Sequence, residues 1–185
     1  MAIGGGGGIS VSGPGGSVRL TFEIVGGERL DVTLSRFGQE VSDWRPFFRE
    51  EVAPKFFETL QSNLAGQGSY VGGYAPLSEP YGSWKAQHYP GKTILRREDQ
   101  IYNSLTWSGG PGPGGVYRDS PSSVEMGTSV PHAGPHQVGS GRLPVRKIVF
   151  LPVGASESYG RLAHRWVVAQ AKAAGLNTSA GSQSA

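Results

Sequence analysis

Residues 41–63, VSDWRPFFREEVAPKFFETLQSN, carry the pattern that decides the fold. Large apolar side chains recur every four residues, a spacing typical of the buried face of a helix: Trp44, Phe48, Val52, Phe56 and Leu60. Ser42 or Asp43 can cap the helix, and Pro46 fits its first turn, where the missing N–H is not needed. Pro54 lies inside the pattern and should kink the helix, because its ring crowds the carbonyl of residue 50.

Alternating apolar residues on both sides of this helix predict a small antiparallel sheet. Before it, strands near 18–25 and 29–35 should form a hairpin around Gly26-Gly27, because glycine tolerates positive φ at both turn positions. After it, strands are expected within 116–127 and over 143–153. A sheet packed against a long helix makes the expected fold class α+β.

The rest of the chain divides into loops, one further long helix and two appendages. Residues 156–174 have a helical pattern, which is followed by a polar tail, so 154–185 are expected to form a C-terminal unit outside a single domain at 18–153. Residues 1–17 contain eight glycines and should form a flexible arm. Between these units, a short helix over 83–88 and another from Lys92 to Leu105 are expected.

The composition excludes several classes of protein. The 185 residues include 30 glycines and 13 prolines, about twice the usual share, which argues against a compact helical bundle. The absence of cysteine excludes a disulfide scaffold, a thiol nucleophile and a cysteine-ligated zinc site. No apolar run is long enough to span a membrane, and the N-terminus lacks the regions of a signal peptide, so we expect work or assembly in a cytoplasm.

Basic residues gather in the C-terminal part of the chain. Residues 1–63 hold six Lys or Arg against eight Asp or Glu, whereas 64–185 hold 11 against six. Within 142–172 only Glu157 opposes six cations: Arg142, Arg146, Lys147, Arg161, Arg165 and Lys172. This asymmetry allows contact with nucleic acid or with an acidic protein surface, or it is simply a solvated face.

The strongest catalytic candidates are His132 and His136 in VPHAGPHQVG. Two histidines four apart on a helix can bind zinc, but Pro131, Gly134 and Pro135 argue against a helix here, and the segment holds no acid. No phosphate-binding loop and no G-x-S-x-G nucleophile motif occurs. We therefore expect no enzyme and no cofactor, with a His-dependent metal-binding hydrolase as one alternative and a basic nucleic-acid-binding module as another.

Two segments together resemble a known family. Residues 75–107 read APLSEPYGSWKAQHYPGKTILRREDQIYNSLTW, and residues 124–152 read VEMGTSVPHAGPHQVGSGRLPVRKIVFLP. In this order they resemble the virion-morphogenesis, or tail-completion, family of tailed bacteriophages, which is similar to head–tail joining proteins. Matching positions in the first segment are Pro76, Leu77, Tyr81, Trp84, Lys85, Pro90, Ile94, Leu95, Ser104 and Leu105. Those in the second are Gly127, Thr128, Ala133, His136, Gln137, Gly139, Leu143, Pro144, Val145 and Arg146.

The resemblance covers roughly residues 18–153 and implies a structural role. It implies a non-enzymatic ring, a homohexamer, at the neck or upper tail of a virion assembled in the host cytoplasm. Its partners would be further copies of itself, a head-closure or connector protein, and a tail terminator or tail tube protein, with no membrane involved. Long loops and arms would then be ordered by neighbouring subunits, with the aromatic-rich loops buried at interfaces.

Two sets of candidate contact residues follow from the motifs and the charges. The interface candidates are Tyr81, Trp84, Lys85, His132, His136, Gln137, Pro144 and Arg146. The candidates for contact with DNA in a ring lumen, or with an acidic partner, are Arg142, Lys147, Arg161 and Arg165.

Overall fold

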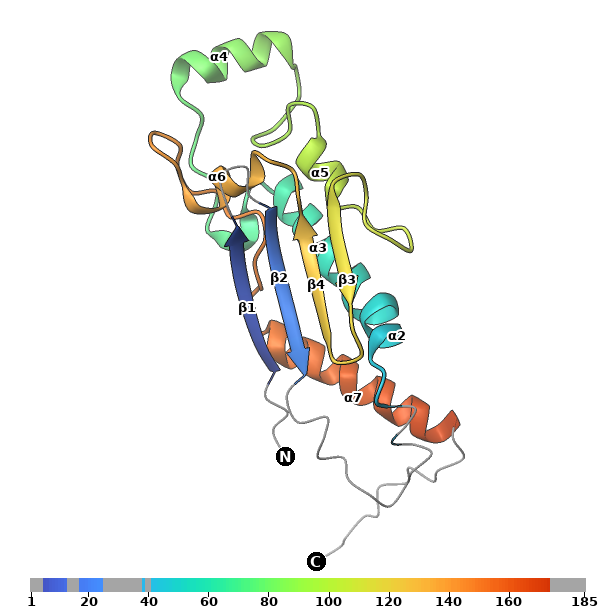
Figure 1. Ribbon diagram of the computed structural model, residues 1–185. Helices are drawn as coiled ribbons and strands as arrows, with labels where there is room; N and C mark the ends of the chain where they lie inside the picture. Colours follow the sequence, from blue (N-terminus) through green and yellow to red (C-terminus); the bar gives the residue numbers. More distant parts are fainter. Residues whose placement is uncertain (1–4, 13–16, 25–37, 39–40, 174–185) are drawn as a thin grey trace, which may run out of the picture.

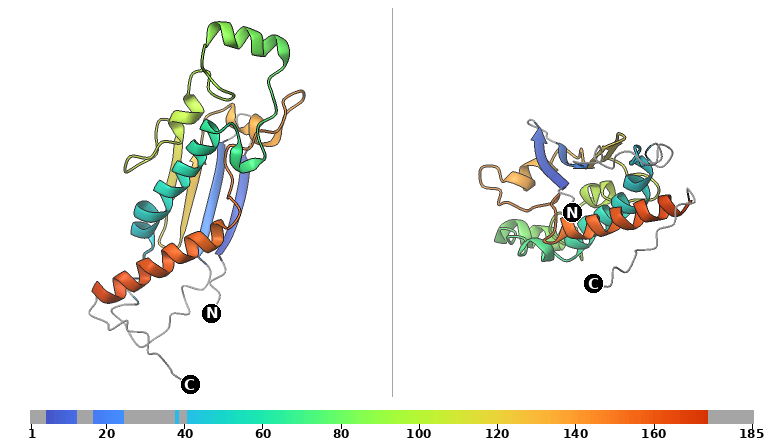
Figure 2. Two further views of the ribbon diagram at one scale, coloured as in Figure 1. Left: turned by 180° about the vertical axis from the view of Figure 1, so that it is seen from behind. Right: turned by 90° about the horizontal axis from the view of Figure 1, so that it is seen from below.

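The computed structural model describes residues 5–12, 17–24, 38 and 41–173. Its centre is a four-stranded antiparallel sheet in the order β1-β2-β4-β3. The strands are β1 (Gly5–Ser12), β2 (Ser17–Ile24), β3 (Gly115–Asp119) and β4 (Ser123–Thr128). Helices cover one face of this sheet (Figures 1 and 2), so the α+β class expected from the sequence is confirmed.

The long helix forms as expected, but with a change of pitch. It comprises α2 (Arg45–Phe47), a π-helical turn η2 (Phe48–Val52) and α3 (Ala53–Ala65). The turn lies directly before Pro54, and the Ala53 N–H donates to the carbonyl of Phe48, five residues back. A wider turn relieves the clash between the proline ring and the preceding carbonyls. Pro54 therefore changes the helical pitch without interrupting the buried face.

The core lies between this helix, the sheet and α7 (Ala155–Ala173). Trp44 and Trp166 pack with ring centroids 5.1 Å apart, which fixes α7 across the start of the long helix. Phe57 stacks on Trp107 at 5.3 Å, which ties the helix to the loop before β3. The largest fully buried side chains come from the long helix, the region of α5, β4 and the segment after α6: Phe48, Phe56, Phe57, Leu60, Leu64, Ile101, Leu105, Met126, Ile148 and Val124.

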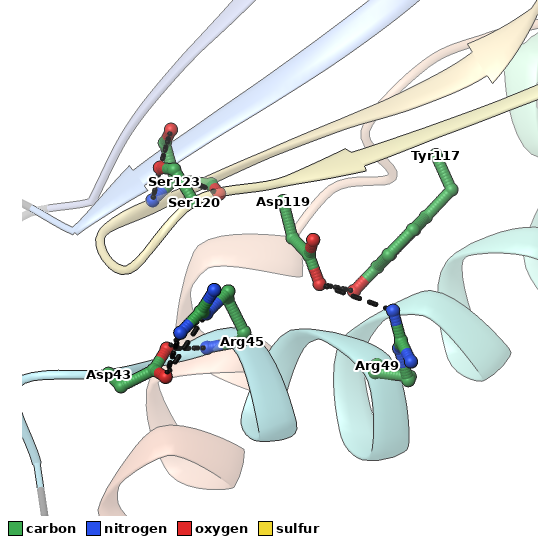
Figure 3. A network of polar contacts seen from close by, with 7 residues as sticks. All are labelled: Asp43, Arg45, Arg49, Tyr117, Asp119, Ser120 and Ser123. Carbon is green, nitrogen blue, oxygen red and sulfur yellow. Dashed lines mark hydrogen bonds and ion pairs between the residues drawn. The ribbon is translucent and has the colours of Figure 1, made fainter.

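Polar contacts join the β3–β4 hairpin to the start of the long helix (Figure 3). The Tyr117 hydroxyl donates to Asp119 at 3.0 Å, and Arg49 lies 3.8 Å from the same carboxylate. Burial of the Tyr117 ring, together with its bond to Asp119, raises the pKa of that phenol to about 12. Polar contacts therefore hold the β3–β4 hairpin against the long helix in addition to the apolar packing of the core.

The sheet differs from the prediction at its N-terminal edge. Gly5–Ser12, within the expected flexible arm at 1–17, pair with all eight residues of β2. Glycine keeps a full set of backbone donors and acceptors, so a glycine-rich segment can satisfy a strand edge despite its low strand propensity. The expected return strand at 29–35 lies outside the described residues, and both edges of β2 are occupied by β1 and β4.

The strand expected over 143–153 is wrong. Residues 148–150 and Arg146 of this segment are buried, but its only ladder contact is an isolated bridge between Leu143 and Ser140. Several of its backbone groups bond to side chains instead. The Gln137 amide forms hydrogen bonds with the backbone of residues 148 and 149. The side chains of Asn63 and Tyr74 donate to the carbonyl of Lys147. The apolar run at 148–151 correctly indicated burial, but it could not reveal that side chains replace the neighbouring strand.

The shorter helices also depart from the sequence pattern. The helix expected from Lys92 to Leu105 is reduced to α5 (Gln100–Ser104), because Asp99 takes a positive φ of 56°. In contrast, α6 (Ala133–Val138) forms where glycine and proline argued against a helix. Gly134 and Pro135 occupy its first turn, where backbone N–H groups need no intrahelical partner. The short helix expected at 83–88 is confirmed and extended as α4 (Glu79–His88).

Two smaller features complete the described chain. A 3₁₀ turn, η3 (Ser69–Val71), follows the long helix. The expected C-terminal helix is confirmed by α7. Within the described ranges, every helix is too short or too polar to cross a bilayer.

Candidate functional site: a projecting aromatic arm

Residues 75–99, here called the arm, leave the body of the protein and return to it. The arm contains α4, which stands clear of the sheet and the long helix at one end of the molecule (Figures 1 and 2). Only one of its 25 residues is buried, and that residue is Lys85. A segment of this length without an apolar core of its own is stabilised mainly by polar contacts and by binding to a partner.

The exposed face of α4 carries a stack of rings. Tyr81 and Trp84 are stacked with centroids 5.6 Å apart, and Trp84 and His88 are stacked at 4.6 Å. Tyr89 packs against Trp84 at 5.7 Å, and Arg97 lies over the Tyr89 ring. Tyr81 and Trp84 are 39% and 38% exposed, which places two large aromatic side chains on a projecting surface.

Lys85 lies on the inner side of α4. It is only 4% exposed and donates to the backbone carbonyl of Thr93. This bond joins α4 to the part of the arm that returns to the body. Burial, with the charges of Arg97 and Arg146 nearby, lowers the pKa of this ammonium. Lys85, an expected interface residue, is therefore an internal brace of the arm.

Arg146 fastens the outgoing root of the arm. Its Nε and Nη2 donate to the carbonyls of Ala75 and Pro76, each at 3.0 Å, and its backbone N–H donates to the carbonyl of His136 at 2.7 Å. The planar guanidinium holds two successive carbonyls with donors in a fixed fork, whereas an ammonium has no such fixed geometry. Burial lowers the pKa of Arg146.

Arg96 and Ile94 attach the returning end of the arm to the body, and Asp99 holds Arg96 in place. Arg96 and Lys92 both bond to its carboxylate, and the Arg96 bond is the main reason that the pKa of Asp99 lies below its ordinary value. The Arg96 guanidinium also lies 3.9 Å from the centre of the Tyr102 ring, on α5. Gln67 accepts a bond from the Ile94 N–H at 3.0 Å. The arm is therefore held at both roots, while its tip stays exposed.

Gln137 and His136 lie beneath the arm on α6. The Gln137 amide bonds three backbone groups of the extended segment: Nε2 donates to the Val149 carbonyl at 2.6 Å, and Oε1 accepts from Ile148 and Val149 at 2.7 and 3.0 Å. In the described part of the chain, the buried Nδ1 of His136 has no hydrogen-bond partner. Burial, with smaller contributions from Arg146 and His132, lowers the pKa of His136 to about 4.

The remaining expected contact residues lie in three places. His132 is exposed directly before α6, and burial of part of its ring, with the charge of Arg97, lowers its pKa. Pro144 is half-buried, while Arg142 and Lys147 are exposed around the loop after α6. Arg161 and Arg165 are exposed on α7, at the other end of the sheet. The expected basic group therefore separates into two surfaces.

Sequence reasoning missed the polar residues that organise the base of the arm. Asn63, fully buried on α3, donates to the Tyr74 hydroxyl at 2.9 Å and accepts from the Tyr70 N–H at 3.0 Å. The Tyr74 hydroxyl in turn donates to the Lys147 carbonyl at 3.1 Å. The available signal was an asparagine at a core-facing position of the helix, because a buried amide requires partners.

The described residues of this site show no arrangement typical of a catalytic or metal-binding centre. Within the described ranges, His, Asp and Glu side chains form no group of three that could hold a metal ion. The buried hydroxyls of Ser104 and Thr128 bond to each other at 2.7 Å and join α5 to β4. What the arrangement provides is a braced, exposed aromatic surface suited to binding.

Comparison with known proteins finds no relative. No family model matches the chain, and searches of curated proteins and of solved structures return no match either.

Proposed function

We propose that the protein is a structural subunit of a tailed-phage neck, a tail-completion protein that forms a ring between the DNA-filled head and the tail tube. The observation that carries the proposal is the arm, whose exposed Tyr81–Trp84 stack stands outside the core of its own subunit. Aromatic side chains of this kind are enriched at the centres of protein interfaces.

The motif residues of the family-like segments support the same proposal. Arg146 bonds the backbone at the root of the arm, Gln137 bonds the extended segment beneath it, and Lys85 braces the arm internally. Residues shared with a structural family are expected to preserve a shape, and these three hold the arm in position. The sequence pattern and the geometry therefore point to one assembly surface.

The proposed ring is a homohexamer located in the virion neck or upper tail. Each arm docks on the next copy, in the head-to-tail manner that closes cyclic rings. The axial neighbours are a head-closure or connector protein on one side and a tail terminator or tail tube protein on the other. His132 and His136 do not favour a metal-dependent hydrolase, because the described residues supply no third ligand beside them.

Light scattering during size exclusion tests the proposal, alone and after mixing with the head-closure or connector protein. We expect an oligomer, formed by the chain itself or with that partner, and its loss in the double variant Tyr81→Ser/Trp84→Ser. The matched control is Tyr70→Ser, since Tyr70 is 55% exposed but lies outside the arm. A chain that stays monomeric with and without the partner, or a double variant that assembles normally, would contradict the proposal.

A further inference from the structure

The outer face of α7 carries a line of cations. Arg161, Arg165 and Lys172 are all exposed and fall within about 40° of one another around the helix axis, at 3.6 residues per turn. Along the axis they are separated by about 6 and about 10 Å. We call these three residues the α7 stripe. His164 is exposed beside it.

Little negative charge opposes the stripe. Glu157 is the only acid in α7, and it lies 3.8 Å from Arg161 with both side chains more than two-thirds exposed. Such a surface pair contributes less than about 1 kcal/mol and is readily exchanged for another anion. Within the described ranges, Arg165 and Lys172 have no ion pair.

The same helix face lacks the groups that other partners require. Trp166, the only Trp of α7, is buried in the core, so the exposed imidazole of His164 is the one ring beside the stripe, and α7 offers no exposed indole on which an unpaired base could stack. The large exposed apolar side chains also lie elsewhere, whereas protein interfaces usually have an apolar centre. A regular row of phosphates is the partner that this charge pattern complements best.

The structure removes the other basic candidates from this surface. Arg146 is buried and bonded to the root of the arm. Arg142 and Lys147 belong to the segment after α6, where the Lys147 carbonyl accepts bonds from Asn63 and Tyr74 at the base of the arm.

We infer that the α7 stripe binds the phosphate backbone of double-stranded DNA without reading its sequence. Each helix contacts about three phosphates, one for each cation, and releases their counterions. The stripe belongs to a single subunit, so this inference does not depend on the proposed ring. A ring would multiply the contacts without changing their nature.

The test is binding of the full-length protein to a fluorescent 24-base-pair duplex, measured by anisotropy at 50 and 200 mM salt. With three phosphate contacts per helix, affinity should fall about 40-fold between these salt concentrations. The variant Arg161→Gln/Arg165→Gln should bind weakly at 50 mM salt. Its affinity should fall only about 3- to 4-fold further between 50 and 200 mM, because about one phosphate contact remains. Arg161→Lys/Arg165→Lys should retain binding, since phosphate contact needs only the charge.

Arg142→Gln/Lys147→Gln is the matched control, because it removes the same charge from the segment after α6 and should bind as the wild type does. An equal loss in both Gln variants would show that net charge alone attracts DNA and would overturn the inference. Absence of binding at 50 mM salt would overturn it as well. So would a poly-glutamate chain that competes as well as unlabelled duplex, because the partner would then be an acidic protein.

Discussion

At the scale of single residues, Gln137 determines how the extended segment 143–153 is buried. One side chain satisfies the N–H groups of Ile148 and Val149 and the carbonyl of Val149. A neighbouring strand would normally supply these bonds. Without it, three buried polar groups depend on one amide, and each would cost about 1–3 kcal/mol if left unpaired.

Replacing this amide should therefore be costly. Gln137→Ala is expected to lower the free energy of unfolding by about 3 kcal/mol or more, because it leaves two buried N–H groups and a carbonyl without partners. Urea titration followed by circular dichroism measures the change. Gln100→Ala is the control, since Gln100 is exposed and bonds only Glu98, and it should alter stability by less than about 0.5 kcal/mol. Similar effects in the two variants would contradict the role given to Gln137.

His136 should make the protein sensitive to acid. Its pKa is about 4 in the folded protein, below the ordinary value of 6.5, because it is half-buried beside Arg146. Protons therefore bind the unfolded chain more readily than the folded one below pH 6.5, and stability falls as the pH drops towards 4. Asp43 and Asp99 have lowered pKa values, so their contributions begin to be lost only below about pH 5, at the acid end of this range.

Melting temperatures between pH 4 and 8 test this dependence. The wild type should be flat above pH 6.5 and fall below it, whereas His136→Gln should fall distinctly less. His164→Gln, at an exposed position on α7, should follow the wild type. A wild-type curve that stays flat down to pH 4, or an unchanged decline in His136→Gln, would show that this ring does not control the acid response.

At the scale of helices and strands, the sequence predicted those elements whose own residues carry the stabilising pattern. The helix at 41–63 was predictable because its apolar residues repeat every four positions, and the strand at 18–25 because its apolar residues alternate; strand structure was also expected within 116–127, but its folding back as the β3–β4 hairpin was not. The strand prediction for 143–153 failed for a physical reason: a run of apolar residues indicates burial, but it does not show which groups bond to the backbone. The strand β1 was missed because glycines contribute backbone bonds without any side-chain pattern.

The candidate site was predictable to a similar extent. The family-like motifs identified Trp84, Lys85, Gln137 and Arg146 as important, but their spacing could not separate exposed from buried positions. Trp84 is exposed, whereas the other three are buried and bond to backbone groups within the chain. Only tertiary structure brings α6 under the arm, so these roles could not follow from one-dimensional spacing.

The attachment of the arm can be tested through Arg146. Arg146→Lys keeps the charge but loses the fixed pair of donors that holds the carbonyls of Ala75 and Pro76 together. Losing about 1.4 kcal/mol at this root should speed local opening about tenfold. Hydrogen exchange should therefore accelerate within 75–99, whereas amides of α3 should exchange as before. Arg142→Lys is the control, and faster exchange throughout the chain would instead mean that Arg146 stabilises the whole fold.

At the scale of the whole molecule, the described chain separates a body that carries the core from surfaces that do not contribute to it. The buried core residues come mainly from the long helix, α5, β4, α6, the segment after α6, and α7. The arm contributes no fully buried apolar side chain, and the α7 stripe lies on the outward side of a helix whose inner side holds Trp166. Folding and association should therefore be separable by mutation.

Replacing Glu79–His88 with ten Gly and Ser residues tests that separation directly. The only buried side chain removed is Lys85, so the loss in stability should stay near 1 kcal/mol and the melting temperature should fall by only about 2–4 °C. Assembly should nevertheless be abolished, because the Tyr81–Trp84 stack is gone. The same replacement of Ala133–Val138 removes Gln137 and should prevent stable folding. If the arm replacement unfolded the protein as well, α4 would belong to the folded body, and its aromatic face would have to be explained by folding within one subunit.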